Sequence, residues 1–179
     1  SARDRVVMFG GGIGTNGSTS LSETWEWDGA VWTQLSVTGP SGRTAPGMEY
    51  DQNRHRTVLF GGYTNSLSTG VSYRGDTWEW DGQSWVQLST TGPAPRSPSC
   101  FAYDSIRAKT VMYGAIPTTS TTDLWEWDGV SWLQRASNTP GPYGLWMTFD
   151  PARARMIMAR YTGSLYEPAE LKALGDVCV

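Results

Sequence analysis

The segment Thr24-Trp25-Glu26-Trp27-Asp28-Gly29 decides the fold, because it returns almost unchanged at residues 77–82 and 124–129. Its copies lie about 50 residues apart, a period typical of repeats that each fold into one small four-stranded sheet. Each copy follows an apolar run that ends in glycine, and each is followed by a further tryptophan. The repetition predicts an all-β chain of sheets in tandem.

The second repeat shows the expected content of one sheet. Strands are expected near residues 47–51, 57–60, 77–80 and 84–88, and Asp81-Gly82 marks a tight turn because glycine accepts positive φ. Side chains alternate along a strand, so Trp78 and Trp80 point the same way and can fill the space between neighbouring sheets. This packing accounts for the high tryptophan content, 10 residues in 179.

The repeated Trp-Glu-Trp-Asp-Gly segments resemble the kelch repeat, in particular its tryptophan-rich bacterial kind. The resemblance covers nearly the whole chain, and it implies a β-propeller of about six or seven four-stranded blades that recognises protein or carbohydrate. Two departures stand out. Gly114-Ala115 interrupts the glycine pair of the third repeat, and Met158-Ala159-Arg160 replaces that pair in the fourth.

We expect a single partial propeller of about 3.5 four-stranded blades over residues 1–179. Its parts are a blade lacking its first strand (1–36), two full blades (47–89 and 99–136) and a degenerate last blade (145–179). Residues 1–5 align with 105–109, so the chain opens inside a blade, and residues 164–167 align with 123–126. Such an arc exposes sheet edges and faces. Either missing sequence, meaning the remaining half of the propeller, or a second chain would complete the ring.

Composition narrows the classes of partner. The formal net charge is −3 and only Lys109 and Lys172 are lysines, so no basic stripe can neutralise a nucleic-acid backbone. No apolar run reaches the roughly 18 to 20 residues of a membrane span. Family habit and the low lysine content favour a bacterial protein in an extracellular, periplasmic or cell-surface location.

The candidates for chemistry are few. The carboxylate pairs Glu26/Asp28, Glu79/Asp81 and Glu126/Asp128 recur with every repeat, whereas a catalytic pair is needed only once, so we expect the aspartates to serve turns and the glutamates to bond between blades. His55 is the only histidine and lies in a turn. We therefore expect no catalytic residue, metal or cofactor in this chain. The alternative is part of a propeller enzyme, carbohydrate-active or oxidase-like, whose catalytic residues lie in absent sequence.

Ligand binding is expected on the long loops 12–22, 63–75 and 115–122, which all join second to third strands and so emerge on one face. The candidate residues there are Tyr63, Asn65, Tyr73, Arg74 and Asn16. Arg43 and Arg96 occupy equivalent places on one rim, where they either grip a partner's carboxylates or bridge adjacent blades. Together these features predict a non-enzymatic scaffold that binds a protein partner or carbohydrate.

Overall fold

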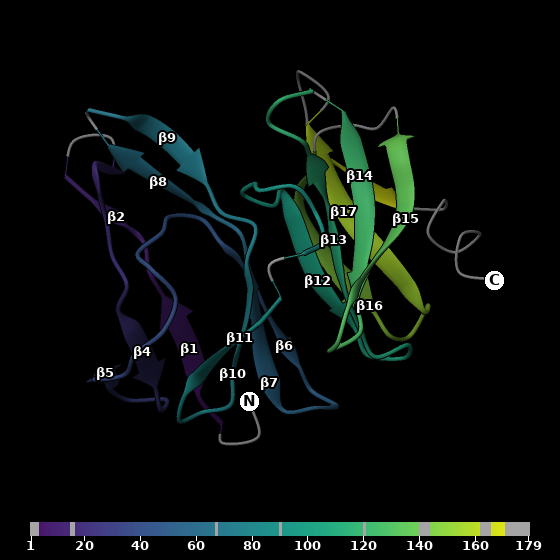
Figure 1. Cartoon of the computed structure of the whole chain (residues 1–179). Helices are drawn as coiled ribbons and strands as arrows, with labels where there is room; N and C mark the ends of the chain where they lie inside the picture. The colour runs from purple at the N-terminus through teal and green to yellow at the C-terminus, as the bar shows by residue number, and fades with distance from the viewer. Residues whose placement is uncertain are drawn as a thin grey trace.

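The computed structural model describes residues 4–14, 17–66, 68–89, 91–119, 121–139, 144–161 and 166–170. These residues form strands and turns without any helix, which confirms the all-β prediction (Figure 1). The strands are β1 (Val6–Phe9), β2 (Gly12–Ile13), β3 (Thr19–Ser20), β4 (Thr24–Trp27), β5 (Trp32–Leu35), β6 (Gly47–Asp51), β7 (Arg56–Phe60), β8 (Tyr63–Ser66), β9 (Gly70–Tyr73), β10 (Thr77–Trp80), β11 (Trp85–Ser89), β12 (Cys100–Asp104), β13 (Lys109–Ala115), β14 (Thr122–Trp127), β15 (Trp132–Thr139), β16 (Gly144–Asp150), β17 (Arg155–Tyr161) and β18 (Tyr166–Glu170).

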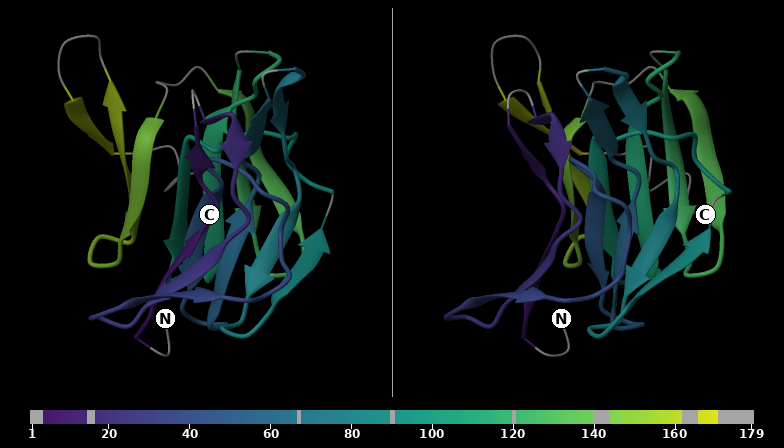
Figure 2. Two further views of the ribbon diagram at one scale, coloured as in Figure 1. Left: turned by 90° about the vertical axis from the view of Figure 1, so that its left-hand side faces the viewer. Right: turned by 60° about the vertical axis from the view of Figure 1, so that its left-hand side comes forward.

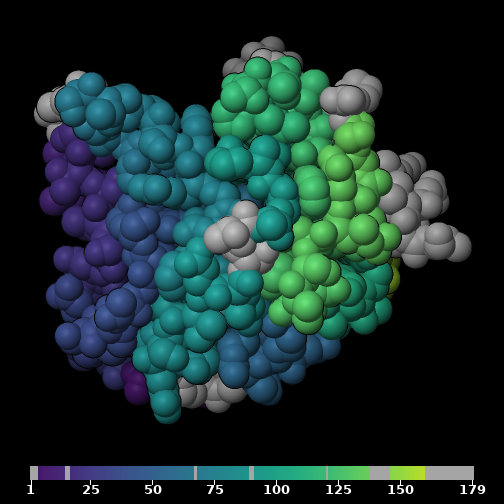
Figure 3. Space-filling view, in the orientation of Figure 1, coloured from purple at the N-terminus to yellow at the C-terminus, as the bar shows by residue number. Residues whose placement is uncertain are grey.

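The strands of the described residues build four antiparallel sheets in chain order. Sheet 1 is β1-β4-β5, sheet 2 is β6-β7-β10-β11, sheet 3 is β12-β13-β14-β15 and sheet 4 is β16-β17-β18. Sheets 1, 2 and 3 are neighbours in space in the order of the chain, as the progression from purple to green across the surface shows (Figure 3). Sheet 4 contacts sheet 3 through β16 and β12. The first strands of sheets 2, 3 and 4 lie together, with β12 between β6 and β16. This is the arrangement of propeller-type folds, in which the first strands line the centre.

Two further hairpins, β2–β3 and β8–β9, occupy the segments expected to be loops. They rise from the same end of sheets 1 and 2 and lie beside each other (Figures 1 and 2). Sequence patterning missed them because short Ser-, Thr- and Gly-rich strands carry no alternation of apolar and polar residues.

The turns follow the predicted chemistry. The carboxylate of Asp81 accepts hydrogen bonds from the backbone N–H groups of Gln83 and Ser84, and Asp28 and Asp128 act in the same way in their repeats. The aspartates therefore serve turns, as the repeat predicts.

The glycine pairs allow a close backbone approach: Gly61 has φ 68°, and a Cβ there would lie 2.2 Å from the carbonyl oxygen of Arg96.

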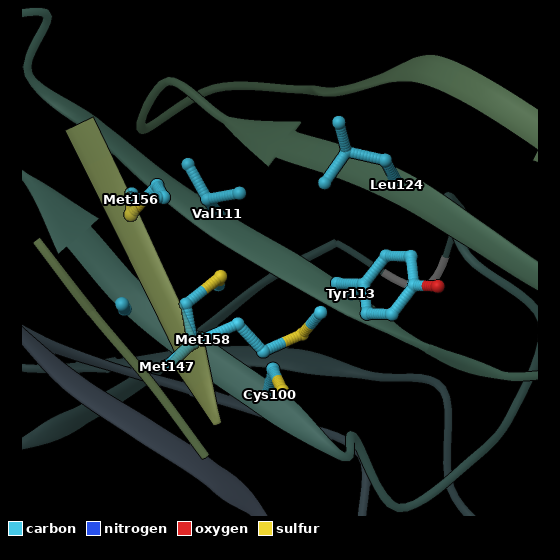
Figure 4. Packing of buried hydrophobic residues seen from close by; sticks show 8 residues of the cluster. Cys100, Val111, Tyr113, Leu124, Met147, Met156 and Met158 are labelled. Atoms are coloured by element: carbon cyan, nitrogen blue, oxygen red, sulfur yellow. The ribbon is translucent and has the colours of Figure 1, made fainter. Parts of the chain in front are cut away.

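Two clusters of buried hydrophobic residues lie between sheets. One lies between sheets 1 and 2 around Phe9, Leu59, Trp80 and Trp85. The other lies between sheets 3 and 4, where methionines from sheet 4 pack against side chains of sheet 3 (Figure 4). Its buried members are Cys100, Ala102, Val111, Tyr113, Leu124, Met147, Met156 and Met158.

Strand pairing in sheet 4 corrects the alignment of the last repeat. Ile157 pairs with Glu170, as Val111 pairs with Glu126 in sheet 3. The position of Glu126 is therefore taken by Glu170, not by Glu167. The local likeness of Tyr-Glu to Trp-Glu is misleading here, because the register depends on the length of the connection between β17 and β18.

Candidate functional site

The repeated tryptophans bond across the sheet interfaces. The indole Nε1 of Trp80 donates to Glu26 at 3.2 Å, and that of Trp85 donates to Thr24 at 2.9 Å. One repeat later, Trp127 donates to Glu79 at 3.2 Å and Trp132 to Thr77 at 2.8 Å. Glu26 and Glu79 thus bond between sheets as expected, whereas Glu126 is bound by Arg107 and Arg135 of its own sheet. This repeated set has a structural role.

Arg43 joins sheet 1 to sheet 2. Its backbone N–H donates to the carbonyl of Leu21, and its own carbonyl accepts from the N–H of Gly11. Gly11 and Leu21 both lie in the connection between β1 and β4 of sheet 1. Its guanidinium donates two hydrogen bonds to Asp76, at 2.6 and 2.9 Å, and a third to the carbonyl of Gly61. Burial raises the pKa of the Asp76 carboxyl, but the bonds from Arg43 and Trp78 outweigh it and hold that pKa below its usual value.

Arg96 repeats the arrangement between sheets 2 and 3. Its backbone bonds to Gly62 and Arg74 in sheet 2, while its guanidinium binds the carboxylate of Asp123 and the carbonyl of Gly114 in sheet 3. Both Arg43 and Arg96 are 0% exposed. Of the two roles considered for them, bridging neighbouring sheets is the one the structure shows. The other role considered for them, binding the carboxylates of a partner, does not fit this structure, because neither side chain reaches the surface.

The predicted loop face is built on the β8–β9 hairpin. Tyr63 and Tyr73 pair across it with ring centroids 6.1 Å apart, and Tyr73 is exposed. Asn65 lies on the same hairpin, and Arg74 follows it with its backbone bonded to Gly62 and Arg96. The last candidate, Asn16, lies outside the described residues. The structure thus groups three candidates on one hairpin with Arg74 directly after it, and all four remain predicted binding residues.

A different site lies where the first strands of sheets 2, 3 and 4 meet. An open cavity of about 350 Å³ is lined there by Glu49 and Tyr50 of β6, Tyr103 of β12, Thr148 of β16, and the turn residues Gln52 and Ser105. Glu49 also lines a second cavity of about 250 Å³ on the side of β1. This site is rich in hydrogen-bonding groups and lies at the centre of the arc.

Glu49 is the group most available to a ligand in this cavity. Burial raises the pKa of its carboxyl above the ordinary value, and a bond from the backbone N–H of Tyr50 offsets this only in part. Within the described part of the chain, no side chain donates a hydrogen bond to the Glu49 carboxylate. A partly buried carboxylate of this kind gains from any ligand that brings hydrogen-bond donors.

The groups beside Glu49 differ in their bonding: Asp51 is paired, whereas the buried hydroxyl of Tyr103 meets no hydrogen-bond partner among the described residues. Tyr103 lies by Asp51, and burial together with that carboxylate raises the pKa of the Tyr103 hydroxyl to about 12. Asp51 is bonded to Arg54 at 2.7 Å. Burial raises the pKa of Asp51, but the nearby Tyr103 hydroxyl and the bonds from Arg54 lower it below the usual value. Of these residues, Tyr103 lines the cavity.

Sequence reasoning missed Glu49 although a signal was present. The three first strands place Glu49, Ala102 and Thr148 at the same register position, opposite Val58, Val111 and Ile157. A carboxylate that appears in one repeat and not in the others is unnecessary for the repeat's packing. That exception within the repeat distinguishes a ligand-binding candidate from a structural residue.

Among the described residues, no cluster of three or more His, Cys, Asp or Glu side chains is placed to hold a metal ion. The same residues contain no helix that could span a membrane.

Comparison with known proteins supports the fold. No family model and no curated protein matches the chain. Among solved structures, the structure of YjhT aligns with a TM-score of 0.65 and 12% identity, over 93% of this chain and 64% of that one. The crystal structure of a nidogen/laminin complex aligns with a TM-score of 0.53 and 15% identity, over 83% of this chain and 52% of that one. The chain therefore spans less than two thirds of these structures, and with them it shares a propeller-type fold.

Proposed function

We propose that this chain is a non-enzymatic binding scaffold, part of a larger kelch-type propeller, whose ligand is a carbohydrate held in the cavity around Glu49. The proposal rests on a contrast between two kinds of carboxylate in this chain, those that recur with the repeat and those that do not. The recurring glutamates Glu26 and Glu79 bond sheet to sheet, whereas Glu49, which has no counterpart in the other repeats, lines a cavity formed by three sheets. A scaffold with one variable site has this pattern.

The lining favours a neutral, hydroxyl-rich ligand. Carboxylates accept bonds from vicinal sugar hydroxyls, and the amide of Gln52 and the hydroxyls of Ser105 and Thr148 can both donate and accept. Aromatic rings of Tyr50 and Phe149 add apolar surface. The volume suits a monosaccharide unit within the open cavity.

The test is isothermal titration of the chain with glucose, galactose, mannose and N-acetylglucosamine. At least one sugar should bind saturably, and Glu49→Gln should weaken it by about 10- to 100-fold, since a bond to a charged group contributes about 1.5–3 kcal/mol. Glu23→Gln removes the same charge far from the cavity and should leave binding unchanged.

Two outcomes would overturn the proposal. In one, none of the four sugars binds. In the other, Tyr73→Ala on the β8–β9 hairpin abolishes sugar binding while Glu49→Gln does not, which would place the ligand on the loop face.

A further inference from the structure

The β8–β9 hairpin goes beyond what the repeat needs. In sheet 3 the equivalent connection, between β13 and β14, is a short turn in which the N–H of Ile116 donates to the carbonyl of Thr121 at 2.8 Å. In sheet 2 the same connection forms two four-residue strands that rise past the end of the sheet (Figure 1). Sheet 3 packs without such a hairpin, so the extra length in sheet 2 is available for a task other than packing.

The strand β9 is an open edge. In the pairing of the described residues it is bonded to β8 alone, while β8 has β3 of the neighbouring hairpin on its other side. All four residues of β9 are exposed, with Val71 at 52% and Tyr73 at 40%, and a Cβ added at Gly70 would meet no other part of the chain within 4 Å. Sheet 3 follows sheet 2 and is present, so this edge is not opened by an absent neighbour.

The sequence of β9 does not protect this edge. Proteins usually close an exposed edge with a lysine or another charge, a proline or a bulge, which prevent a further strand from pairing there. The strand reads Gly70-Val71-Ser72-Tyr73, with no charge and no proline, and it pairs with β8 in regular register. Since side chains alternate along a strand, Val71 and Tyr73 lie on the same face. An incoming strand would therefore find free backbone groups beside an apolar and an aromatic side chain.

Charge is scarce at this end of the molecule. The three connections that join second to third strands, residues 10–22, 61–73 and 115–122, contain no charged residue. The turns at the opposite ends of the sheets instead carry pairs of an aspartate and an arginine, such as Asp51–Arg54 and Asp104–Arg107. The first charge after β9 is Arg74, which directly follows the strand.

Arg74 has no acidic partner in the part of the chain that the structure describes. Its Nε is buried there without a hydrogen-bond partner, whereas Arg43 and Arg96 each bind a carboxylate. The nearest acid in the sequence, Asp76, is already held by Arg43 and by the indole of Trp78. A partner that brings a carboxylate to this end of β9 therefore gains a charge-assisted hydrogen bond.

From these observations we propose that the outer edge of β9 binds an extended acidic segment of a partner protein by strand addition. The segment pairs antiparallel with β9, as β8 does, and its alternate side chains lie beside Val71 and Tyr73. Antiparallel pairing puts the N-terminal end of the added strand next to the C-terminal end of β9, so a carboxylate at that end of the segment binds Arg74. This partner site is separate from the proposed sugar site, whose turn residues Gln52 and Ser105 lie at the opposite end of the sheets.

A second copy of this chain does not supply the required charge. If two β9 edges paired antiparallel, each Arg74 would lie beside the start of the other β9. Residues 61–73 contain no carboxylate side chain, so both guanidinium groups would stay without an acidic partner. An acidic segment of another protein meets both requirements of the site, the open edge and the unpaired cation.

The probe is the acetylated peptide Asp-Glu-Thr-Val-Thr-Val-Thr with a fluorophore at its C-terminus, and fluorescence anisotropy should show that it binds saturably. Arg74→Met should weaken binding by about 10-fold or more, the usual effect of losing a hydrogen bond between charged groups. Arg74→Lys should retain part of the affinity. The matched control Arg56→Met removes a partly exposed arginine at the other end of sheet 2 and should leave binding unchanged.

Variants of the peptide test the strand geometry without altering the protein. The reversed sequence, with its acids at the C-terminal end, should bind roughly 10-fold more weakly, because antiparallel pairing then carries the acids away from Arg74. Proline in place of the first valine removes a backbone N–H and should abolish binding. Hydrogen exchange of at least one backbone amide among residues 70–73 should slow roughly fivefold or more when the peptide is bound.

Several results would overturn the proposal: no saturable binding of the acidic peptide, equal binding by Arg74→Met, or equal binding of the proline peptide. So would a dimer in sedimentation that Val71→Lys dissociates, because the occupant of the edge would then be a second copy. Glu49→Gln should leave peptide binding unchanged, and a loss there would put the peptide in the cavity. Sugar titration is a separate readout, so failure of the sugar proposal is distinguishable from failure of this one.

Discussion

The interface between sheets 2 and 3 and that between sheets 3 and 4 are built from different materials. The first has two indole bonds to buried acceptors and the buried Arg96–Asp123 pair. The second is an apolar cluster rich in methionine. The position equivalent to Arg96, eight residues before the strand-ending aspartate, is Pro142 in the sequence of the last repeat, a residue without a guanidinium.

Glu126 shows how the chain adapts to this change. Glu26 and Glu79 accept an indole from the next sheet, but in the last repeat the residue after Glu170 in the sequence is Leu171, which has no indole. Glu126 is bound by Arg135 at 2.7 Å instead, and Arg135 replaces the leucine found at 35 and 88. The comparison teaches that directional polar bonds define the repeat's interface, whereas flexible methionines fill an interface that has lost them.

The largest expected effect comes from Arg96→Met. It leaves the Asp123 carboxylate buried without its cation, a loss of about 3–5 kcal/mol in the free energy of unfolding. Urea unfolding followed by circular dichroism measures it. The matched control is Arg153→Met, because the Arg153 side chain that binds Asp150 is largely exposed; its expected loss is much smaller than that of Arg96→Met. Equal losses in the two variants would contradict the bridging role.

Trp32 in sheet 1 and Trp85 in sheet 2 occupy equivalent positions, so substituting each one compares an exposed tryptophan with a buried one. Trp85→Ala empties a buried site bonded to Thr24 and should lower the free energy of unfolding by about 3–5 kcal/mol. Trp32→Ala, at an exposed position, should lower it by less than about 1 kcal/mol. A loss for Trp32→Ala as large as that for Trp85→Ala would mean that its ring is already packed in the isolated chain.

Arg135→Leu restores the residue of the other repeats and should cost about 1 kcal/mol at neutral pH, a value reduced by the partial exposure of Arg135. Burial raises the pKa of the Glu126 carboxyl, but the bonds from Arg107 and Arg135 outweigh burial and hold that pKa below its usual value. A lowered carboxyl pKa stabilises the fold at higher pH, and this contribution is lost as the pH falls through the folded value. Thermal melts of the two proteins should therefore converge in acid; a difference that persists there would indicate a packing effect.

The smallest expected effect is a gain. Burial raises the pKa of Glu49, so the folded chain holds its proton more tightly than the unfolded one and loses stability as the pH rises through that window. Glu49→Gln should raise the melting temperature slightly at neutral pH. The advantage should vanish well below the ordinary glutamate pKa of 4.5. A lower melting temperature at neutral pH would show that the carboxylate has a stabilising partner.

The sequence by itself determined the all-β class, the Asp-Gly turns and the interface role of the tryptophans, because each depends on local spacing: period 2 along a strand and about 50 between repeats. Only the tertiary structure decided what Arg43 and Arg96 bind and which groups surround Glu49. Their partners lie on other sheets, at distances along the chain that no local pattern encodes. The register of β18 and the hairpins β2–β3 and β8–β9 needed the structure for the same reason, since strand pairing depends on contacts between segments and not on the residues of one segment alone.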